Sequence, residues 1–371
     1  KRFYNLGAEF SFNTSVDGEE TSVTLSGLSE NMEASIQLFE KLLQGPIASQ
    51  EALNKLVGRI IKSRSDAKKN KNIILRNQLY AYGKYGEVNP ASNNLNTKDL
   101  EDLRVEDLTD LIKNLSNYSH RILYYGKMNQ NSLSHMVKTY HKIPESFSEI
   151  INIENYKEKI YDQEYIFWTH FDMVQTEIIL LSKLELLDNA KTAAIRLFNQ
   201  YFGAGMNSIV FQEIREAQGL AYSVYSTFSQ ANKPDRSDYL YSYIGIQSDK
   251  QSEALSSMFS LINNLPESQQ AFEISKKAIL NKIESERITK SSILYSYLNA
   301  EKRGINFDIR EQVYNEVKAM DLEKLLKFHK TYIKDKPHNI LLIGNRDKID
   351  FKNLKKYGII KEVSLDELFG F

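Results

Sequence analysis

The stretch FQEIREAQGLAYSVY, residues 211–225, changes from one kind of secondary structure to another within a short span. Its first half has helical spacing that ends at Gly219, and its second half alternates apolar and small residues as a strand does. Arg215 lies in the last turns of the predicted helix, where the helix dipole favours a cation. No carboxylate lies three or four residues from Arg215, so a local helix salt bridge does not account for it.

Tyr222 lies just past the break, seven residues after Arg215 and at the start of the predicted strand. A guanidinium and a phenol both donate hydrogen bonds without a metal, so the two side chains can converge on one carbonyl oxygen. A surface arginine and a packed tyrosine would fit the same residues, so the local pattern leaves both interpretations open.

Outward from this stretch, the chain has alternating strand and helix patterns in both halves. The predicted strands are residues 8–16, 21–26, 120–126, 164–170, 176–182, 222–229, 239–247 and 338–344. Helices are predicted at residues 50–71, 73–82, 105–115, 190–201, 207–217, 270–303 and 309–332. Two more begin after Ser29 and after Ser248, and another ends at about His141.

Two matched spacings indicate a duplicated domain. The pattern His-x-Ile-Leu-x-x-Gly occurs at residues 120–126 and again at 338–344, and the strand-to-helix corners at Gly27 and Gly245 each precede the final Gly by 99 residues. We therefore predict two duplicated α/β domains, each a mostly antiparallel sheet with helices packed on one face.

The expected boundaries are a first domain at residues 1–145, a linker at 146–162 and a second domain at 163–371. The linker has weak periodicity and many charges. The first copy lacks the opening strand and helix that the second has at 164–217, and the chain begins with Lys1. Both observations lead us to expect a piece of a longer product.

Composition excludes several classes of function. Basic and acidic residues are equal in number at 48 each, which gives no support to nucleic-acid binding. Without cysteine there can be no thiolate metal site, disulfide or cysteine nucleophile, and the compartment stays open, with export slightly favoured. No apolar run is long enough to span a bilayer, so no membrane span is expected.

The sequence gives weak support for a catalytic or metal-binding site within this chain. No two histidines are three or four residues apart, and neither H-E-x-x-H nor H-x-x-E-H occurs, so we expect no metal site and no catalytic residue here. There is no G-x-S-x-G either. The loop from Gly203 to Gly205 before a helix leaves a phosphate site open, although a tight turn explains it equally without a G-K-[ST] motif.

The segments FGAGMNS (202–208), FQEIRE (211–216) and GLAYS (219–223) together resemble the C-terminal signature of the insulinase/pitrilysin family of zinc metallopeptidases. In that family each unit has two similar α/β domains, and two units enclose a peptide. The resemblance identifies this chain as a non-catalytic half, because residues 56–62 have no Glu where the active unit needs one. A peptidase-derived scaffold subunit is the alternative.

The resemblance also implies site residues and partners. Arg215 and Tyr222 are expected to hold a substrate backbone carbonyl, and Gly203 and Gly205 to shape the loop beside the peptide. Zinc is expected in a catalytic partner half, either in the same polypeptide or in a separate chain, and none is expected in this one. The expected partners are thus a zinc-bearing insulinase-type unit and a peptide substrate.

Overall fold

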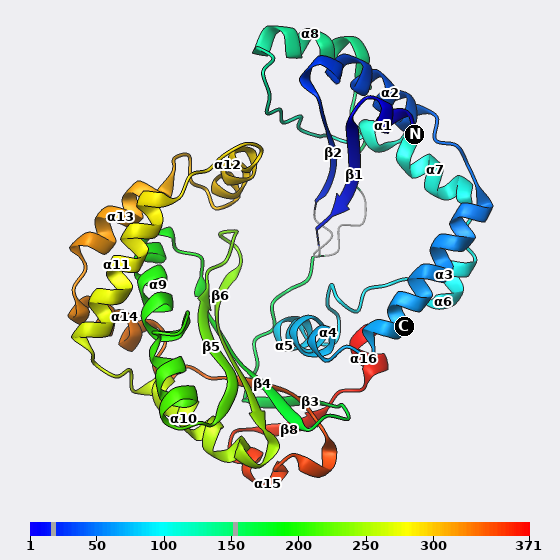
Figure 1. Ribbon diagram of the computed structural model, residues 1–371. Helices are drawn as coiled ribbons and strands as arrows, with labels where there is room; N and C mark the ends of the chain where they lie inside the picture. The colour runs from blue at the N-terminus through cyan, green and yellow to red at the C-terminus, as the bar shows by residue number, and fades with distance from the viewer. Residues whose placement is uncertain (16–19, 151–154) are drawn as a thin grey trace. The chain divides into compact units, whose positions relative to one another are not determined.

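The computed structural model describes residues 1–15, 20–150 and 155–371, which form two compact units. The first unit contains residues 1–67, 93–156 and 370–371, and the second contains 68–92 and 157–369 (Figure 1). After residues 93–156 of the first unit, the chain returns to the second unit at residue 157, inside the expected linker. Residues 68–92, which we expected in the first domain, belong to the second unit. The described linker residues contain no helix or strand, and 151–154 lie outside the described residues.

The first unit consists of a β-hairpin and helices. Its elements are α1 (Arg2–Asn5), β1 (Ala8–Thr14), β2 (Thr21–Gly27), η1 (Ser29–Asn31), α2 (Met32–Gln44), α3 (Gln50–Ala67), α6 (Thr97–Glu101), α7 (Val105–Lys113), η3 (Leu115–Asn117) and α8 (Gln130–Tyr140).

β1 and β2 correspond to the predicted strands at 8–16 and 21–26 and pair antiparallel from Ala8↔Gly27 to Thr14↔Thr21, while residues 16–19 lie outside the described residues. The predicted apolar face of α2 meets this hairpin, where the ring of Phe39 lies 6.2 Å from that of Phe10. A second small cluster, Leu53, Val57 and Leu100, joins α3 to α6. The described part of the first unit therefore buries apolar side chains in small clusters such as these.

The predicted strand at residues 120–126 is wrong: this segment is irregular. Nearby, an isolated bridge joins Tyr118 to Ser148. The His120 ring bonds to the Tyr118 carbonyl. A strand needs neighbours to satisfy its backbone groups, and the described part of the first unit has no sheet beyond the hairpin. Of the two matched segments, only the second is a strand.

The second unit is a six-stranded sheet with helices. Its elements are α4 (Lys71–Ile73), η2 (Ile74–Leu79), α5 (Tyr80–Tyr85), β3 (Tyr165–His170), β4 (Gln175–Leu186), η4 (Asn189–Lys191), α9 (Thr192–Phe198), η5 (Asn199–Gly203), η6 (Phe211–Ala217), β5 (Ala221–Ser229), β6 (Ser237–Gln247), η7 (Ser248–Lys250), α10 (Gln251–Asn263), α11 (Gln269–Ser285), α12 (Ser292–Lys302), α13 (Ile309–Ala319), α14 (Leu322–Tyr332), β7 (Asn339–Gly344), η8 (Arg346–Lys348), α15 (Phe351–Leu354), β8 (Ile359–Glu362) and α16 (Leu365–Phe369).

The strand order is β5-β6-β4-β7-β3-β8. β6 is antiparallel to both β5 and β4, and β7 is antiparallel to β4, whereas β3 runs parallel to β7 and β8. The sheet is therefore mostly antiparallel, as predicted. Its central strands are apolar on both faces, which is typical of strands covered from both sides.

Two predicted helices are interrupted. The stretch predicted as one helix at 270–303 is divided between α11 and α12, with Lys290 in the left-handed region at φ 54°. The stretch at 309–332 is divided between α13 and α14, because the Asp321 side chain accepts from the Lys324 amide and caps a new helix.

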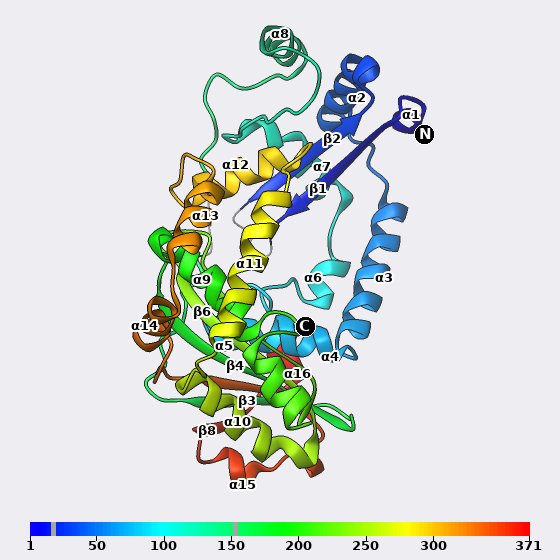
Figure 2. The same cartoon turned by 60° about the vertical axis from the view of Figure 1, so that its left-hand side comes forward.

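The main helical layer covers one face of the sheet. Leu240, Ile244 and Ile246 of β6 pack there with residues of α9, α10, α11, α13 and α14 in the main core. Figure 1 shows α9, α11, α13 and α14 on one side of β5 and β6, and Figure 2 shows α10 and α11 from another direction. This layer confirms the predicted packing of helices on one face.

Residues 71–85 lie against the opposite face. Gly83 touches this face so closely that a Cβ would lie 2.6 Å from a methyl of Leu341 and 3.4 Å from one of Leu181. Tyr82 packs edge-on to Phe167 with the ring centroids 5.2 Å apart. The helices beyond the main layer thus bury the second face of β3, β4 and β7.

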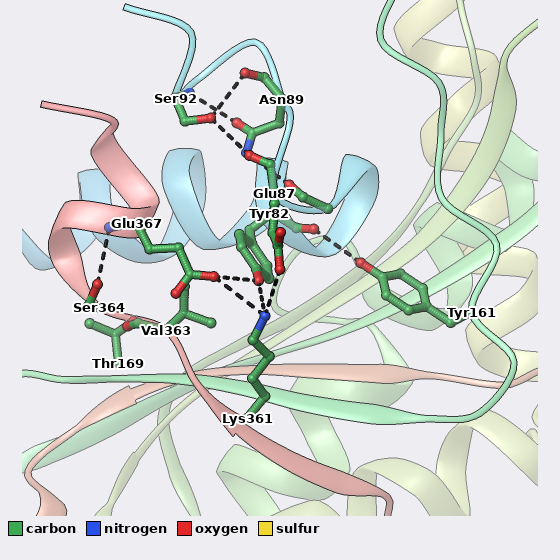
Figure 3. A network of polar contacts seen from close by, with 11 residues as sticks. Tyr82, Glu87, Asn89, Ser92, Tyr161, Thr169, Lys361, Val363, Ser364 and Glu367 are labelled. Atoms are coloured by element: carbon green, nitrogen blue, oxygen red, sulfur yellow. Dashed lines mark hydrogen bonds and ion pairs between the residues drawn. The ribbon is translucent and has the colours of Figure 1, made fainter. Parts of the chain in front are cut away.

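A polar network attaches these residues to the C-terminal end of the second unit (Figure 3). The Tyr82 hydroxyl donates to Glu367 at 2.7 Å and accepts from Lys361 at 2.5 Å. Lys361 also donates to Glu87 at 3.1 Å. Burial raises the pKa of Tyr82 to about 12, so the phenol remains a hydrogen-bond donor at neutral pH. A cavity of about 690 Å³ lies beside the network, whose charged groups pair with one another.

The buried imidazole of His338, which directly precedes β7, makes the stability of the second unit depend on pH. Burial lowers the pKa of His338 to about 4, whereas an unfolded histidine has a pKa of about 6.5. Between these values the unfolded chain binds the proton and the folded chain does not. The stabilisation is complete above about pH 6.5 and is lost as the pH falls towards 4.

We expect His338 to contribute on the order of 3 kcal/mol to this loss. Urea titrations across this pH window should show a shallower fall for His338→Asn, which keeps an amide donor but does not titrate. Substitution of the exposed His135 by Asn serves as the control and should leave the slope unchanged. Equal slopes for wild type and His338→Asn would contradict the assignment.

Candidate functional site

Arg215 lies on a short π-helical segment, η6, that ends where the sequence predicts. Gly219 has φ +62°, and its amide bonds to the Arg215 carbonyl at 3.2 Å, which closes the helix. The guanidinium carbon of Arg215 lies 4.8 Å from the centre of the Phe211 ring. Its nearest acid is the adjacent Glu216, at 3.7 Å, and the side chain is 45% exposed. The aromatic ring therefore supports a guanidinium that remains open to solvent.

A β-bulge decides which way Tyr222 faces. Strict alternation along β5 would place Tyr222 on the core side with Val224 and Phe228. The register shifts between Ala221 and Ser223, so that Ala221 packs in the core and Tyr222 turns to the opposite face. There the amide nitrogen of Gln247 donates to the Tyr222 oxygen at 2.5 Å. The ring is 53% exposed.

Aromatic residues continue along this face of β5 and β6, which we call the tyrosine face: Tyr222, Tyr225, Tyr239, Tyr241 and Tyr243. Tyr225 stacks on Tyr241 and Tyr243 with centroids 5.9 and 5.2 Å apart. Arg76, from the segment that lies against this side, places its guanidinium 4.4 Å from the Tyr243 ring centre and donates to the Tyr225 hydroxyl at 3.3 Å. The cationic side chain of Arg76 therefore packs on the tyrosine face.

Lys71 compensates a buried carboxylate beneath this face. Its ammonium lies 2.5 Å from Glu177, whose side chain is only 4% exposed. Gly245, opposite Glu177 on β6, has no side chain, which leaves room for the Tyr243 hydroxyl. Burial, with Glu177 adding, raises the pKa of Tyr243 to about 12. The buried charge of Glu177 is therefore balanced by a lysine that remains partly exposed.

Tyr222 opens onto a cavity of about 670 Å³ in the second unit. The lining residues come from α4, the β3–β4 turn, the start of β4, β5, the end of β6, η7 and η8: Lys71, Met173, Val174, Gln175, Tyr222, Gln247, Ser248, Asp249 and Lys348. Ser248 is committed elsewhere, since its hydroxyl bonds to Thr176 at 2.8 Å and to the Val174 carbonyl at 3.0 Å. Tyr222 and the charged residues are thus the groups that a ligand would meet.

Of the two residues singled out in the sequence, only Tyr222 lines this cavity. Both side chains are exposed, and within the described ranges no hydrogen bond or ion pair joins Arg215 to Tyr222. Each one has hydrogen-bonding capacity left for a third group.

The two loop glycines have different surroundings. Gly203 is buried, and a Cβ there would lie 2.0 Å from the carbonyl oxygen of Ser226. Gly205 is exposed, has φ +83° and has open space around its Cα. Gly203 therefore permits close packing against β5, whereas Gly205 permits the left-handed turn that follows.

The histidines of this chain do not fit a zinc site. The Nε2 atoms of His120 and His141 lie 2.8 Å apart, while Glu40 bonds to the far ring nitrogen of His141, also at 2.8 Å. His329 bonds to a backbone carbonyl in the core. In residues 1–15, 20–150 and 155–371, no three His, Asp or Glu residues gather as a metal would require.

The family follows from the segment that contains the π-helix and the bulged strand. A family model described as the peptidase M16 inactive domain matches residues 103–279. Over these residues the chain matches the M16 peptidase family. The comparisons support the non-catalytic C-terminal half of the insulinase type, which the resemblance in the sequence implies.

Proteins similar to this chain are distant in sequence, but the similarity covers most of its length. It is 21% identical to the non-peptidase homolog YmxG of Helicobacter pylori, across 91% of this chain and 78% of that protein. The solved peptidase M16 inactive domain from Pseudomonas fluorescens has a TM-score of 0.68 and 17% identity, over 92% of this chain and 82% of that one. The periplasmic protease PqqL from Escherichia coli has a TM-score of 0.67 and 12% identity, over 93% of this chain and 38% of its own length.

Several residues of this candidate site have no local signal in the sequence. Gln247, Lys71 and Arg76 reach the tyrosine face from elements distant from residues 211–225.

A helix long and apolar enough to cross a membrane is not found among the described residues.

The packing of Gly203 gives a stability test. We expect Gly203→Ala to lower the free energy of unfolding by about 1–3 kcal/mol or more, because backbone must move to admit the methyl group. Gly205→Ala, where space is open but φ is positive, should cost about 1 kcal/mol. Chemical denaturation monitored by tryptophan fluorescence measures both. A Gly203→Ala variant as stable as wild type would contradict the close approach to β5.

Proposed function

We propose that this chain is the substrate-holding, non-catalytic half of a zinc metalloendopeptidase. The tyrosine face and η6 would hold an extended peptide, while a zinc-bearing M16 half, in the same polypeptide or another, cleaves it. The observation that carries this proposal is the orientation of Tyr222, which the bulge turns away from the core and onto an open cavity.

The hydrogen bond from Gln247 occupies the Tyr222 oxygen as an acceptor and leaves the hydroxyl group able to donate to a carbonyl ligand. Because the Gln247 amide donates to the phenol oxygen, the hydroxyl proton remains available to donate to a peptide carbonyl. Arg215, held on Phe211, would supply the second donor. Donors aimed at a developing oxyanion are worth roughly 2.7–4 kcal/mol each in comparable sites.

The outer edge of β5 offers backbone groups to the same peptide. Asn199 accepts from the Phe228 amide at 2.6 Å and donates to its carbonyl at 3.0 Å, so these groups point away from β6. Alternate residues of an antiparallel strand point the same way, which includes Val224. Gly203 covers the edge at Ser226, and within the described residues no strand pairs with this edge. A peptide strand could add at the end nearest Tyr222.

The loop glycines support this proposal in different ways. Gly203 would position the loop by its contact with β5, and the exposed backbone at Gly205 would lie beside the peptide. The length comparison also supports a divided enzyme, because this chain covers only 38% of the protease PqqL. Both proposed donors belong to the second unit.

We expect the isolated chain neither to cleave peptides nor to bind zinc stoichiometrically, because no three His, Asp or Glu residues gather as metal ligands among the described residues. Quenched-fluorescence peptide substrates test cleavage, and elemental analysis after dialysis against zinc measures the bound metal. Turnover that disappears on chelation would show that this chain carries its own active site.

In the reconstituted enzyme, we expect Arg215→Ala to lower kcat/KM by about 100-fold and Tyr222→Phe by about tenfold, since each removes one donor to the substrate carbonyl. Arg287→Ala and Tyr295→Phe, exposed residues outside the site, should leave kcat/KM unchanged. Wild-type kinetics for both site variants would remove the proposed role and favour a structural subunit.

A further inference from the structure

The cavity beside Tyr222 presents hydrogen-bond donors from two lysines on separate elements. Lys71 begins α4 and Lys348 ends η8, and both line the cavity. We propose that this cavity is a subsite for a carboxylate of the bound peptide, from an acidic side chain or from the C-terminus. This inference rests on the proposed function, because Tyr222 would hold the backbone next to the subsite.

Lys71 retains donors although its charge is balanced. An ammonium has three N–H groups, and a single contact at 2.5 Å joins it to Glu177. Glu177 is buried, whereas Lys71 lines the cavity and remains partly exposed. The remaining Lys71 donors are therefore available to a ligand carboxylate.

Lys348 adds a second positive charge to the cavity. It is exposed, and within the described residues it makes no ion pair. Asp249, the one acid among the lining residues, lies in the first turn of η7 before α10, where the positive end of the helix dipole offsets its charge. The balance of the lining therefore favours an anion over a cation.

The remaining walls suit a short acidic side chain. Met173 and Val174 provide apolar surface for the methylene groups, and Gln175 adds a neutral amide. Gln247 and Ser248 are already engaged with Tyr222 and Thr176 respectively. The free donors thus belong to the lysines and Gln175, and an acidic residue next to the held carbonyl would meet them.

Competition binding on the full chain tests the subsite. A fluorescein-labelled reference peptide would be displaced by degenerate peptide mixtures with blocked ends and a central Glu, Gln or Lys. We expect the Glu mixture to compete about two- to fivefold better than the Gln mixture, with Lys weakest. The preference should decrease as salt is added. A Gln mixture with a free C-terminus distinguishes a terminal carboxylate from a side chain.

Substitution of Lys348 tests the residue itself without disturbing the buried Glu177. Lys348→Gln should abolish most of the preference, and Lys348→Glu should reverse it. Lys355→Gln, an exposed lysine outside the cavity, should leave it intact. If the mixtures bind equally well whatever their charge, the carboxylate subsite is wrong while the proposed function stands. If no peptide binds at all, the proposed function fails, and the subsite with it.

Discussion

Burial of the central strands β4 and β7 on both faces is the constraint on which the second unit depends. One face packs against the main helical layer, and the other packs against residues 71–85. Gly83 makes the second contact possible, because the backbone of α5 can approach Leu341 without a side chain between them. This packing also brings Lys71 and Arg76 to the tyrosine face, so the same contact that stabilises the sheet helps to build the site.

The edge strand β5 is less buried than the central strands, and the polar groups of the candidate site lie on and beside it. β5 has one edge partly closed by Asn199 and Gly203, and its first residues are bulged. Edge strands invite uncontrolled pairing, and capping most of β5 while leaving one end open restricts where another strand could add. Under the proposed function, stability comes from the centre of the sheet and peptide binding from its edge.

Much of the second unit could be predicted from local pattern. The strands near residues 164–170, 222–229 and 239–247 are present, and the helix ends at Gly219 as its sequence indicates. Residues 120–126 have the same strand pattern but form none, because a strand depends on neighbours that periodicity does not reveal. Apolar periodicity likewise does not indicate the breaks after α11 and α13, of which the second depends on Asp321 capping α14.

By itself, the sequence determined the family resemblance, the identity of Arg215 and Tyr222, and the lack of a histidine pair suited to zinc. These are properties of residue type and short spacing, which the chain carries before it folds. Only the tertiary structure decided that Tyr222 faces a cavity, that Gln247 orients it and that Lys71 and Lys348 stand nearby. A one-residue bulge reverses the face of a side chain, and contacts between distant segments arise only when their buried surfaces pack together.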